Sequence, residues 1–219
     1  MAKDRLEDRE GKKLSIPRVV ASAVIALAVL VFVFLAGYMV SFLNYQRVSN
    51  IQDTLKTDFL STQLSGELLK DCNDNAFATF SEELDKTGSL ISILETRFGK
   101  DDLNVIDQKK TYSLIELQHF MAVKEYSSTC GKNIDTILFF YSNNNKYGTR
   151  AEDVGKILES VKRNNPDVMI YSFDYDLDMG IIQLMKEIYS VSGPNTAVLN
   201  GNIHLDSIET SFDVMKYLK

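Results

Sequence analysis

Residues 19–43 constrain this chain most, because 25 consecutive positions there carry no charged side chain. As a helix, this stretch would be about 37 Å long, which exceeds the hydrocarbon core of a bilayer at about 30 Å. A cleaved signal peptide has an apolar core of only about 7–15 residues, followed by small residues at the cleavage site. We therefore predict that residues 19–43 form a retained transmembrane helix.

The distribution of basic residues predicts the orientation of this helix. Residues 44–61, which follow the span, contain only Arg47 and Lys56. The preceding segment, residues 1–18, contains six basic side chains: Lys3, Arg5, Arg9, Lys12, Lys13 and Arg18. Since loops rich in lysine and arginine stay in the cytoplasm, we expect residues 1–18 there and residues 44–219 outside it.

The charge balance argues against a nucleic-acid partner. Residues 1–18 have six basic and four acidic side chains, a net charge of +2. The whole chain has a net charge of −6, so residues 19–219 carry −8. An exterior domain this acidic would repel a phosphate backbone.

The two cysteines, Cys72 and Cys130, both lie in the part predicted to be exported, where disulfides persist. We predict a structural disulfide between them. By closing a loop in the unfolded chain, this bond would stabilise the fold by about 4 kcal/mol in the chain-entropy model. Free thiols and an intermolecular bridge remain as alternatives.

The region 44–129 is predicted to be a helical hairpin or a coiled-coil-like stalk. Apolar residues recur at helical spacing over residues 48–98, with a polar break at residues 72–75. Residues 97–110 are interpreted as a polar connector, and Ser113 and Glu116 have the capping-box spacing of a further helix start. His119 has no neighbouring metal-ligand pattern, so no metal site is predicted. The apolar stripes are interpreted as core packing, with a partner-binding or oligomer-forming face as the alternative.

The region 130–219 has an α/β pattern. Residues 136–142 and 167–176 are apolar runs typical of buried strands. Residues 196–199 and 203–205 flank Asn200-Gly201, a strong hairpin signal. Helices are predicted after the first, second and fourth of these strands, with Thr149, Asp178 and Asp206 as their caps. The resulting order is β-α-β-α-β-β-α, in which the first two strands should be parallel.

This order, with the motifs "ILFFYSN", "YSFDYDLD" and "VSGPNTAVLNG", resembles the thioredoxin fold over about residues 130–219. With its anchor and helical middle, the chain is similar to the uncharacterised membrane-anchored thioredoxin-like proteins of small-genome archaea. Active thioredoxin-like proteins carry a Cys-x-x-Cys pair between the first strand and the next helix, whose N-terminus makes the first thiol acidic. That pair would fall on Asn145 and Gly148, or on Gly148 and Ala151, and neither register has a cysteine.

The family's cis-proline position is also altered. Aligning Thr196 and Asn200-Gly201 with the family motif puts Asn195 at that position and Pro194 one place earlier. A cis bond before Asn195 would cost about 2.5–4 kcal/mol, so we expect it to be trans; a cis bond before Pro194 stays open. Family members bind extended peptides beside this loop. The resemblance therefore implies a residual peptide groove, formed by the residues Gly148, Thr149, Arg150, Ala151, Pro194, Asn195 and Thr196.

Three functions remain open from the sequence. The leading hypothesis is a non-enzymatic binding or scaffold protein, held in the membrane by residues 19–43 and exposing a redox-inactive thioredoxin-like domain to a protein or peptide partner. The alternatives are a thiol-disulfide oxidoreductase that uses Cys72 and Cys130, and a structural stalk subunit of a membrane complex. None of the three calls for a cofactor.

Overall fold

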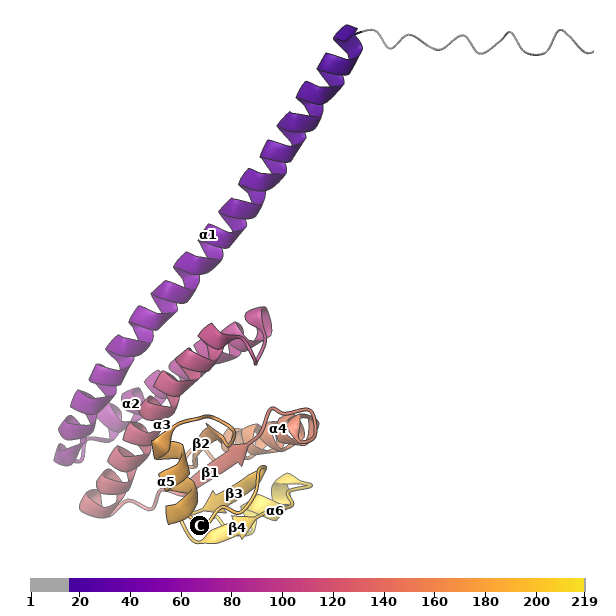
Figure 1. Ribbon diagram of the computed structural model, residues 1–219. Coiled ribbons are helices and arrows are strands. Elements are labelled where there is room, and N and C mark those ends of the chain that lie inside the picture. Colours follow the sequence, from indigo (N-terminus) through magenta and orange to yellow (C-terminus); the bar gives the residue numbers. More distant parts are fainter. Residues whose placement is uncertain (1–15, 219) are drawn as a thin grey trace, which may run out of the picture. The chain divides into compact units, whose positions relative to one another are not determined.

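The computed structural model describes residues 16–218, which divide into two compact units, one ending at Asn50 and one beginning at Ile51 (Figure 1). The first unit is the N-terminal part of helix α1 (Ile16–Leu68). The predicted segment 1–18 lies outside the described residues except for its last three positions.

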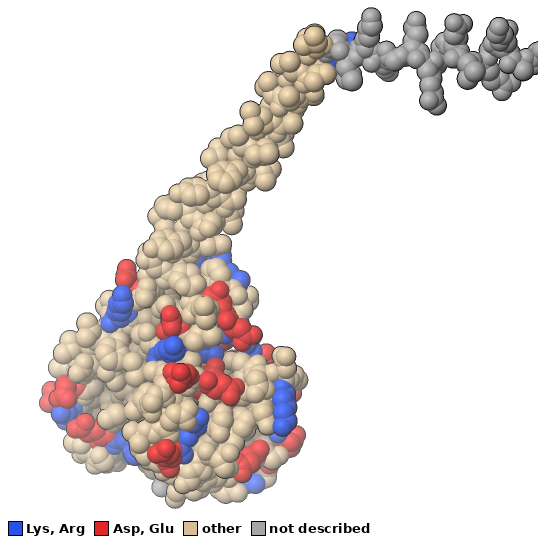
Figure 2. Space-filling model, viewed as in Figure 1, with Lys and Arg blue, Asp and Glu red and all other residues tan. Residues whose placement is uncertain are grey.

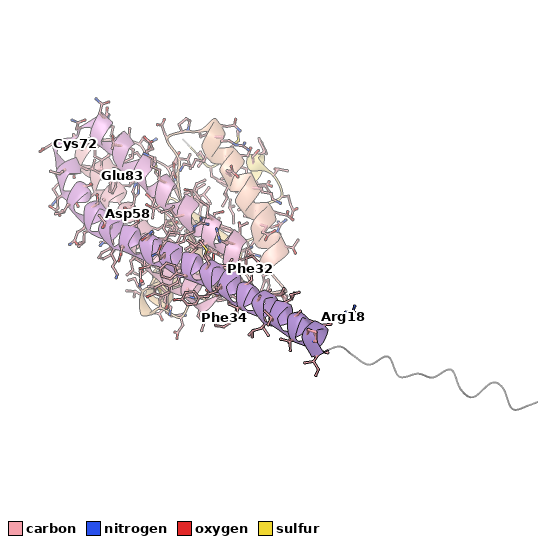
Figure 3. All side chains as sticks on the ribbon, turned by 90° about the horizontal axis from the view of Figure 1, so that it is seen from above. Arg18, Phe32, Phe34, Asp58, Cys72 and Glu83 are labelled. Carbon is pink, nitrogen blue, oxygen red and sulfur yellow. A yellow bond between two sulfur atoms is a disulfide. The ribbon has the colours of Figure 1, made fainter. Side chains whose placement is uncertain are left out.

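Helix α1 confirms the prediction of a long apolar helix near the N-terminus. Phe32 and Phe34 project from it in Figure 3, and Phe32 is 72% exposed. Figure 2 shows most of this stretch of helix in tan, without acidic or basic side chains. In length and composition it is the one helix among residues 16–218 that could cross a membrane, and its apolar window is not buried in the protein. The helix continues well beyond the predicted end at residue 43.

The second unit contains the remaining elements. They are the 3-10 turn η1 (Leu69–Asp71), the helices α2 (Asp74–Phe98), α3 (Leu103–Cys130), α4 (Gly148–Asn164), α5 (Gly180–Ile188) and α6 (Ser211–Met215), and the strands β1 (Thr136–Tyr141), β2 (Met169–Asp174), β3 (Thr196–Leu199) and β4 (Ile203–Leu205). Basic and acidic side chains are interspersed on the face of this unit seen in Figure 2.

The four strands form one mixed sheet in the order β2-β1-β3-β4. Strands β1 and β2 are parallel, whereas β3 is antiparallel to both β1 and β4. Asn200 and Gly201, with φ of 51° and 79°, make the tight turn between β3 and β4, as an Asn-Gly pair favours. The predicted strand positions and their directions are therefore confirmed.

Both faces of the sheet are covered. One face, which includes Ile137 and Phe139 of β1, packs on α4 and α6 through Leu158 and Val214. The other face carries larger side chains, including Tyr171 and Phe173 of β2, and packs on α5, α2 and α3. Helix α5 has only nine residues, so most of the cover on this side comes from the helices that precede the sheet in the chain.

The helices of region 51–129 are therefore packed into the sheet's own core, with the break between α1 and α2 at the predicted position. Ile51 and Leu55 of α1, Phe80 of α2 and Val123 of α3 belong to the same apolar cluster as the sheet. The Thr87 hydroxyl also donates to Asp58 Oδ2 at 2.7 Å, joining α2 to α1. The apolar stripes in the sequence are the core-facing stripes of these helices, which is the interpretation we favoured.

Several predicted helix starts are wrong. Helix α3 begins at Leu103 inside the predicted polar connector, because Asp102 Oδ1 accepts from the backbone N–H groups of Asn104 at 2.9 Å and Val105 at 3.3 Å. Ser113 and Glu116 lie buried in the middle of this helix, ten and more residues beyond its start.

The three caps predicted for the helices of region 130–219 are also wrong. Helix α4 starts at Gly148 after Tyr147, so Thr149 is already inside it. Helix α5 follows Met179 rather than Asp178. Helix α6 follows Thr210, whose backbone N–H donates to Asp213 Oδ2 at 2.9 Å. Asp206 instead accepts from the Thr196 hydroxyl at 2.8 Å.

Candidate functional site

The structure brings together the two segments of the predicted peptide groove. Asn195 connects them, because its Nδ2 donates to the Tyr147 carbonyl at 3.0 Å, just before α4, and its Oδ1 accepts from the Ser142 N–H at 3.3 Å. Asn195 has a φ of 63°, in the left-handed region that asparagine tolerates. No peptide bond among the described residues is cis, so the bonds before Pro194 and Asn195 are both trans.

The polar groups of these segments are largely used within the protein. Arg150 donates to Glu209 Oε1 at 2.7 Å and to the Ile208 carbonyl at 2.8 Å. Thr196 and Asn195 are buried, and so is Ala151. These segments therefore stabilise the junction between the sheet and α4, and the peptide groove stays a prediction.

The predicted disulfide between Cys72 and Cys130 is confirmed. Cys72 follows η1 and Cys130 is the last residue of α3, so the bond joins two helical ends, with Cα atoms 5.5 Å apart. Figure 3 shows Cys72 at the turn between α1 and α2. Neither cysteine belongs to the β1–α4 loop, where the family's redox pair would stand.

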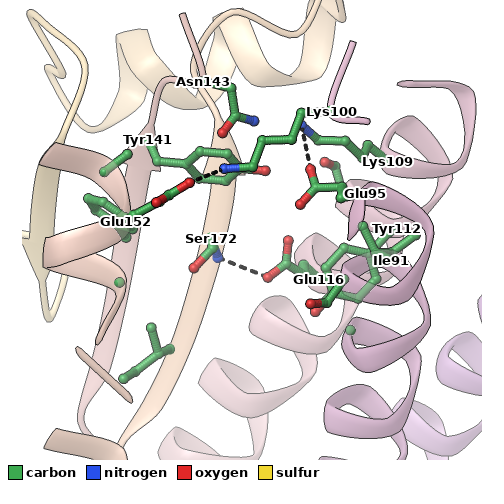
Figure 4. Close-up of a pocket in the computed structure, with 17 residues that line it drawn as sticks. Ile91, Glu95, Lys100, Lys109, Tyr112, Glu116, Tyr141, Asn143, Glu152 and Ser172 are labelled. Atoms are coloured by element: carbon green, nitrogen blue, oxygen red, sulfur yellow. Dashed lines mark hydrogen bonds and ion pairs between the residues drawn. The ribbon is translucent and has the colours of Figure 1, made fainter. Parts of the chain in front are cut away.

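A pocket of about 440 Å³ lies among α2, α3, α4 and the strands β1 and β2 (Figure 4). Its position follows from the sheet order, because β2 is an edge strand whose open side would otherwise expose unpaired backbone groups. The backbone N–H groups of Met169 and Tyr175 donate hydrogen bonds on the β1 side. Because the N–H groups of successive residues in a strand point to alternate sides, the N–H of Ser172 points toward the open edge. Its ionisable lining residues are Glu95, Lys100, Lys109, Tyr112, Glu116, Tyr141 and Glu152.

Glu116 of α3 lines the pocket and forms a hydrogen bond with this open edge of β2. Its Oε1 accepts from the Ser172 N–H at 2.8 Å, which Figure 4 shows, and the residue is only 2% exposed. Its Oε2 makes no hydrogen bond of ordinary geometry. Burial raises the pKa of this carboxyl to about 8, although the Ser172 N–H and the nearby Tyr112 hydroxyl oppose the rise.

A second buried group lies at the other end of the pocket. Lys109 Nζ, in a residue only 4% exposed, lies 3.2 Å from Glu95 Oε1 and 2.5 Å from Asp174 Oδ2. Asn143 Nδ2 also donates to Asp174 Oδ2, at 3.3 Å. One ammonium between two carboxylates leaves this group with a net charge of −1 and ties α2 and α3 to the end of β2.

The two tyrosines that line the pocket stay neutral. Burial raises the pKa of Tyr112 well above its usual range, and the Glu116 charge adds to the rise. The same holds for Tyr141, with Asp174 as the nearest contributing charge. Lys109 Nζ lies 5.4 Å from the centre of the Tyr141 ring, a cation–π contact.

The rim of the pocket is crossed by an exposed ion pair. Lys100, in the loop between α2 and α3, lies 2.7 Å from Glu152 of α4, as drawn in Figure 4. Exposed pairs of this kind contribute only about 0–1 kcal/mol, so the pair adds little to the stability of the fold.

Comparisons of this chain with protein-family models, with curated proteins and with solved structures found no match. Within residues 16–218, no group of three or more His, Cys, Asp or Glu side chains is arranged to hold a metal ion.

The sequence does not predict this pocket. Its local pattern places Glu116 in a capping box and Lys109 in a connector. The available signal was their spacing, because Lys109, Tyr112 and Glu116 recur at i, i+3 and i+7 and so share one face of a helix.

Proposed function

We propose that this chain is a single-pass, membrane-anchored and non-enzymatic binding protein, whose second unit contains a redox-inactive thioredoxin-like domain. The element order, the parallel β1–β2 pair and the antiparallel β3–β4 hairpin support the resemblance. The helices that precede the sheet are then additions that cover one of its faces.

Two observations support the loss of thiol chemistry in this proposal. The β1–α4 loop and the start of α4 have asparagine, glycine and alanine where the family has its two cysteines. The Cys72–Cys130 disulfide joins the end of η1 to the end of α3, a place that suits a covalent staple.

The binding function rests on one observation, that Glu116 lines the pocket while its buried Oε2 makes no hydrogen bond of ordinary geometry. An unsatisfied buried polar atom costs free energy, and a ligand that hydrogen-bonds to it would recover that cost. A concave site with a few convergent polar groups and a perturbed carboxyl is typical of small-ligand sites.

A pocket-filling variant tests this function. Gly155 of α4 lines the pocket, and a Cβ added there would meet no atom within 4 Å. Gly155→Phe should therefore fold and occupy the pocket. Small molecules that raise the melting temperature of the wild-type chain in lipid nanodiscs should lose this effect in the variant, and retention of every such effect would reject the pocket as the binding site.

The anchor and its orientation need a separate test. A membrane-impermeant maleimide should label Glu159→Cys on intact cells, since Glu159 is exposed on α4 in the second unit. It should label Arg9→Cys only after the membrane is permeabilised. The reverse labelling pattern would show that the predicted orientation is wrong.

A further inference from the structure

We propose that the ligand of this pocket carries an ammonium or guanidinium group, which pairs with the Glu116 carboxylate. The inference rests on the proposed binding function and adds the chemical class of the ligand. It follows from the geometry of Glu116, from the charges around the pocket and from the contacts that Lys109 already makes there.

The first step is the fixed orientation of Glu116. The Ser172 N–H holds Oε1 at 2.8 Å, so the carboxyl group cannot turn to offer that atom elsewhere. Oε2 is buried near the Tyr112 hydroxyl and makes no hydrogen bond of ordinary geometry. An ionised carboxylate that is this buried is stable only with a donor and a compensating positive charge, and a ligand cation supplies both.

The second step is the charge of the surroundings. Besides Glu116, the pocket and its adjoining ion pairs contain Glu95, Glu152 and Asp174, and the basic side chains there are Lys100 and Lys109. Both lysines already have carboxylate partners. With Glu116 ionised, four carboxylates face two ammonium groups, so the site repels an anion and attracts a cation.

The third step is the Lys109 site, where the protein already binds an ammonium group of its own. The ammonium of Lys109 lies against Glu95 and Asp174, with the Tyr141 ring 5.4 Å away. At the other end of the pocket, Glu116 and the neutral Tyr112 ring offer the same combination of carboxylate and aromatic side chain. This combination is one that cationic ligands use in proteins.

Binding of a cation should release the proton that Glu116 holds. Several ionisable groups surround Glu116 and influence whether it holds this proton. They are Glu95 and Asp85 of α2, Lys109 and Tyr112 of α3, Tyr141 of β1, Tyr171 of β2 and Glu152 of α4. The affinity for a cation should therefore rise as the pH rises from about 6 to about 9, because the carboxyl group must ionise to pair with it.

The test uses four probes of similar size with the full chain in nanodiscs of neutral phosphatidylcholine. The probes are n-butylammonium, n-butylguanidinium, n-butanol and butyrate, and titration calorimetry or ligand-observed NMR measures binding. Because a ligand of five or so heavy atoms binds weakly, we expect dissociation constants of about 1 mM for the cations. A lysine-containing tripeptide, acetyl-Gly-Lys-Gly-amide, distinguishes a free amine from a side chain of a larger partner by whether it binds as well as n-butylammonium.

Matched variants identify the binding atom. Glu116→Gln keeps an acceptor for the Ser172 N–H but removes the charge, so it should weaken cation binding by roughly tenfold to a hundredfold. Glu159→Gln makes the same chemical substitution on an exposed part of α4 outside the pocket lining and should leave the affinity unchanged.

The outcomes separate this inference from the proposed function. Binding of butanol or butyrate as tight as that of the cations would overturn the inference while leaving a functional pocket. Unchanged cation binding in Glu116→Gln, or no binding of either cation up to about 50 mM, would also overturn it. The proposed function is decided separately, by whether Gly155→Phe abolishes the effect of small molecules on the melting temperature.

Discussion

Glu116 of α3 accepts a hydrogen bond from the backbone N–H of Ser172 at 2.8 Å, and this bond joins a helix to the open edge of the sheet. The two residues are 56 positions apart in the chain. The bond satisfies an edge N–H that no strand pairs with, and it places a carboxyl group where burial disfavours its charge. The same contact therefore completes the fold and gives the pocket its chemistry.

The first prediction concerns the pH dependence of stability. Glu116 has a pKa of about 8 in the folded chain, above its ordinary value of 4.5. Between these values the unfolded chain loses this proton while the folded chain keeps it, so the free energy of unfolding should fall as the pH rises. The total contribution is on the order of a few kcal/mol. In Glu116→Gln the free energy of unfolding should not show this fall with rising pH.

Urea unfolding of the full chain in nanodiscs, followed by near-ultraviolet circular dichroism, would measure it. The signal would come from tyrosine, since the chain has 10 tyrosines and no tryptophan. Glu159→Gln is the control and should keep the wild-type pH dependence. A wild-type stability that does not fall between pH 6.5 and 8 would contradict the prediction.

His119 should produce the opposite slope at lower pH. It is 1% exposed, stacks on Phe80 with ring centres 4.1 Å apart, and its Nδ1 lies 2.9 Å from the Tyr171 hydroxyl. Burial, with a smaller effect from the Lys162 charge, lowers its pKa from 6.5 to about 3. The unfolded chain takes up this proton first as the pH falls, so stability is lost below about pH 6.5.

Between about pH 4.5 and 6.5 the two residues oppose each other. Each state then binds one proton in total at these two sites, at Glu116 when folded and at His119 when unfolded. The pair therefore contributes no slope there. Relative to the wild type, His119→Gln should make stability fall more steeply with rising pH in this range, and Glu116→Gln should make it rise. The same slope in all three proteins would exclude this assignment.

The sequence predicted the strands better than the helix starts. The strands at 136–142 and 196–199 are short apolar runs next to turn residues, and this local signal is strong because both faces of the sheet are buried. The capping-box spacing also occurs inside helices, as it does for Ser113 and Glu116. The true caps of α2 and α3 are Asn73 and Asp102, whose Oδ1 atoms accept from the first N–H groups of each helix.

The pocket could not be predicted because it depends on contacts between distant parts of the chain. Nothing local shows that the polar stripe of α3 faces the open edge of β2 rather than water. Asp174 lies in the predicted strand 167–176, but its partner Lys109 lies 65 residues earlier. Such a pair becomes visible only when the order of strands in the sheet is known.

The third prediction tests that pair. Lys109→Met would leave Glu95 and Asp174 without their shared ammonium, which should cost about 3–5 kcal/mol of stability. Adding Asp174→Asn should recover part of the loss, so the double variant should be more stable than the sum of the two single effects implies. Lys110→Met is the matched control, because its ion pair with Asp107 is exposed and should change stability by at most about 1 kcal/mol. Strict additivity would show that Lys109 and Asp174 do not interact.

The fourth prediction separates backbone strain from hydrogen bonding at Asn195. Asn195→Gly tolerates the φ of 63° but loses the bonds to Tyr147 and Ser142, at a cost of about 1–3 kcal/mol. Asn195→Ala loses the same bonds and adds about 1 kcal/mol of strain, because a Cβ disfavours this conformation. The glycine variant should therefore be the more stable of the two in urea unfolding. Equal or greater stability of the alanine variant would contradict this account.

The last prediction decides between a structural and a catalytic disulfide. The Cys72–Cys130 bond closes a loop with a sequence separation of 58, so replacing both cysteines with alanine should cost about 4 kcal/mol by the chain-entropy model. In the proposed binding protein this loss of stability should be the main effect, and the double variant should bind n-butylammonium like the wild type after correction for the unfolded fraction. An oxidoreductase would instead show reversible oxidation and reduction of the bond in the folded chain, and would lose exchange activity toward a disulfide substrate in either single variant. Thiol trapping across a series of glutathione buffers measures this directly, and a bond that opens only when the chain unfolds would exclude the catalytic alternative.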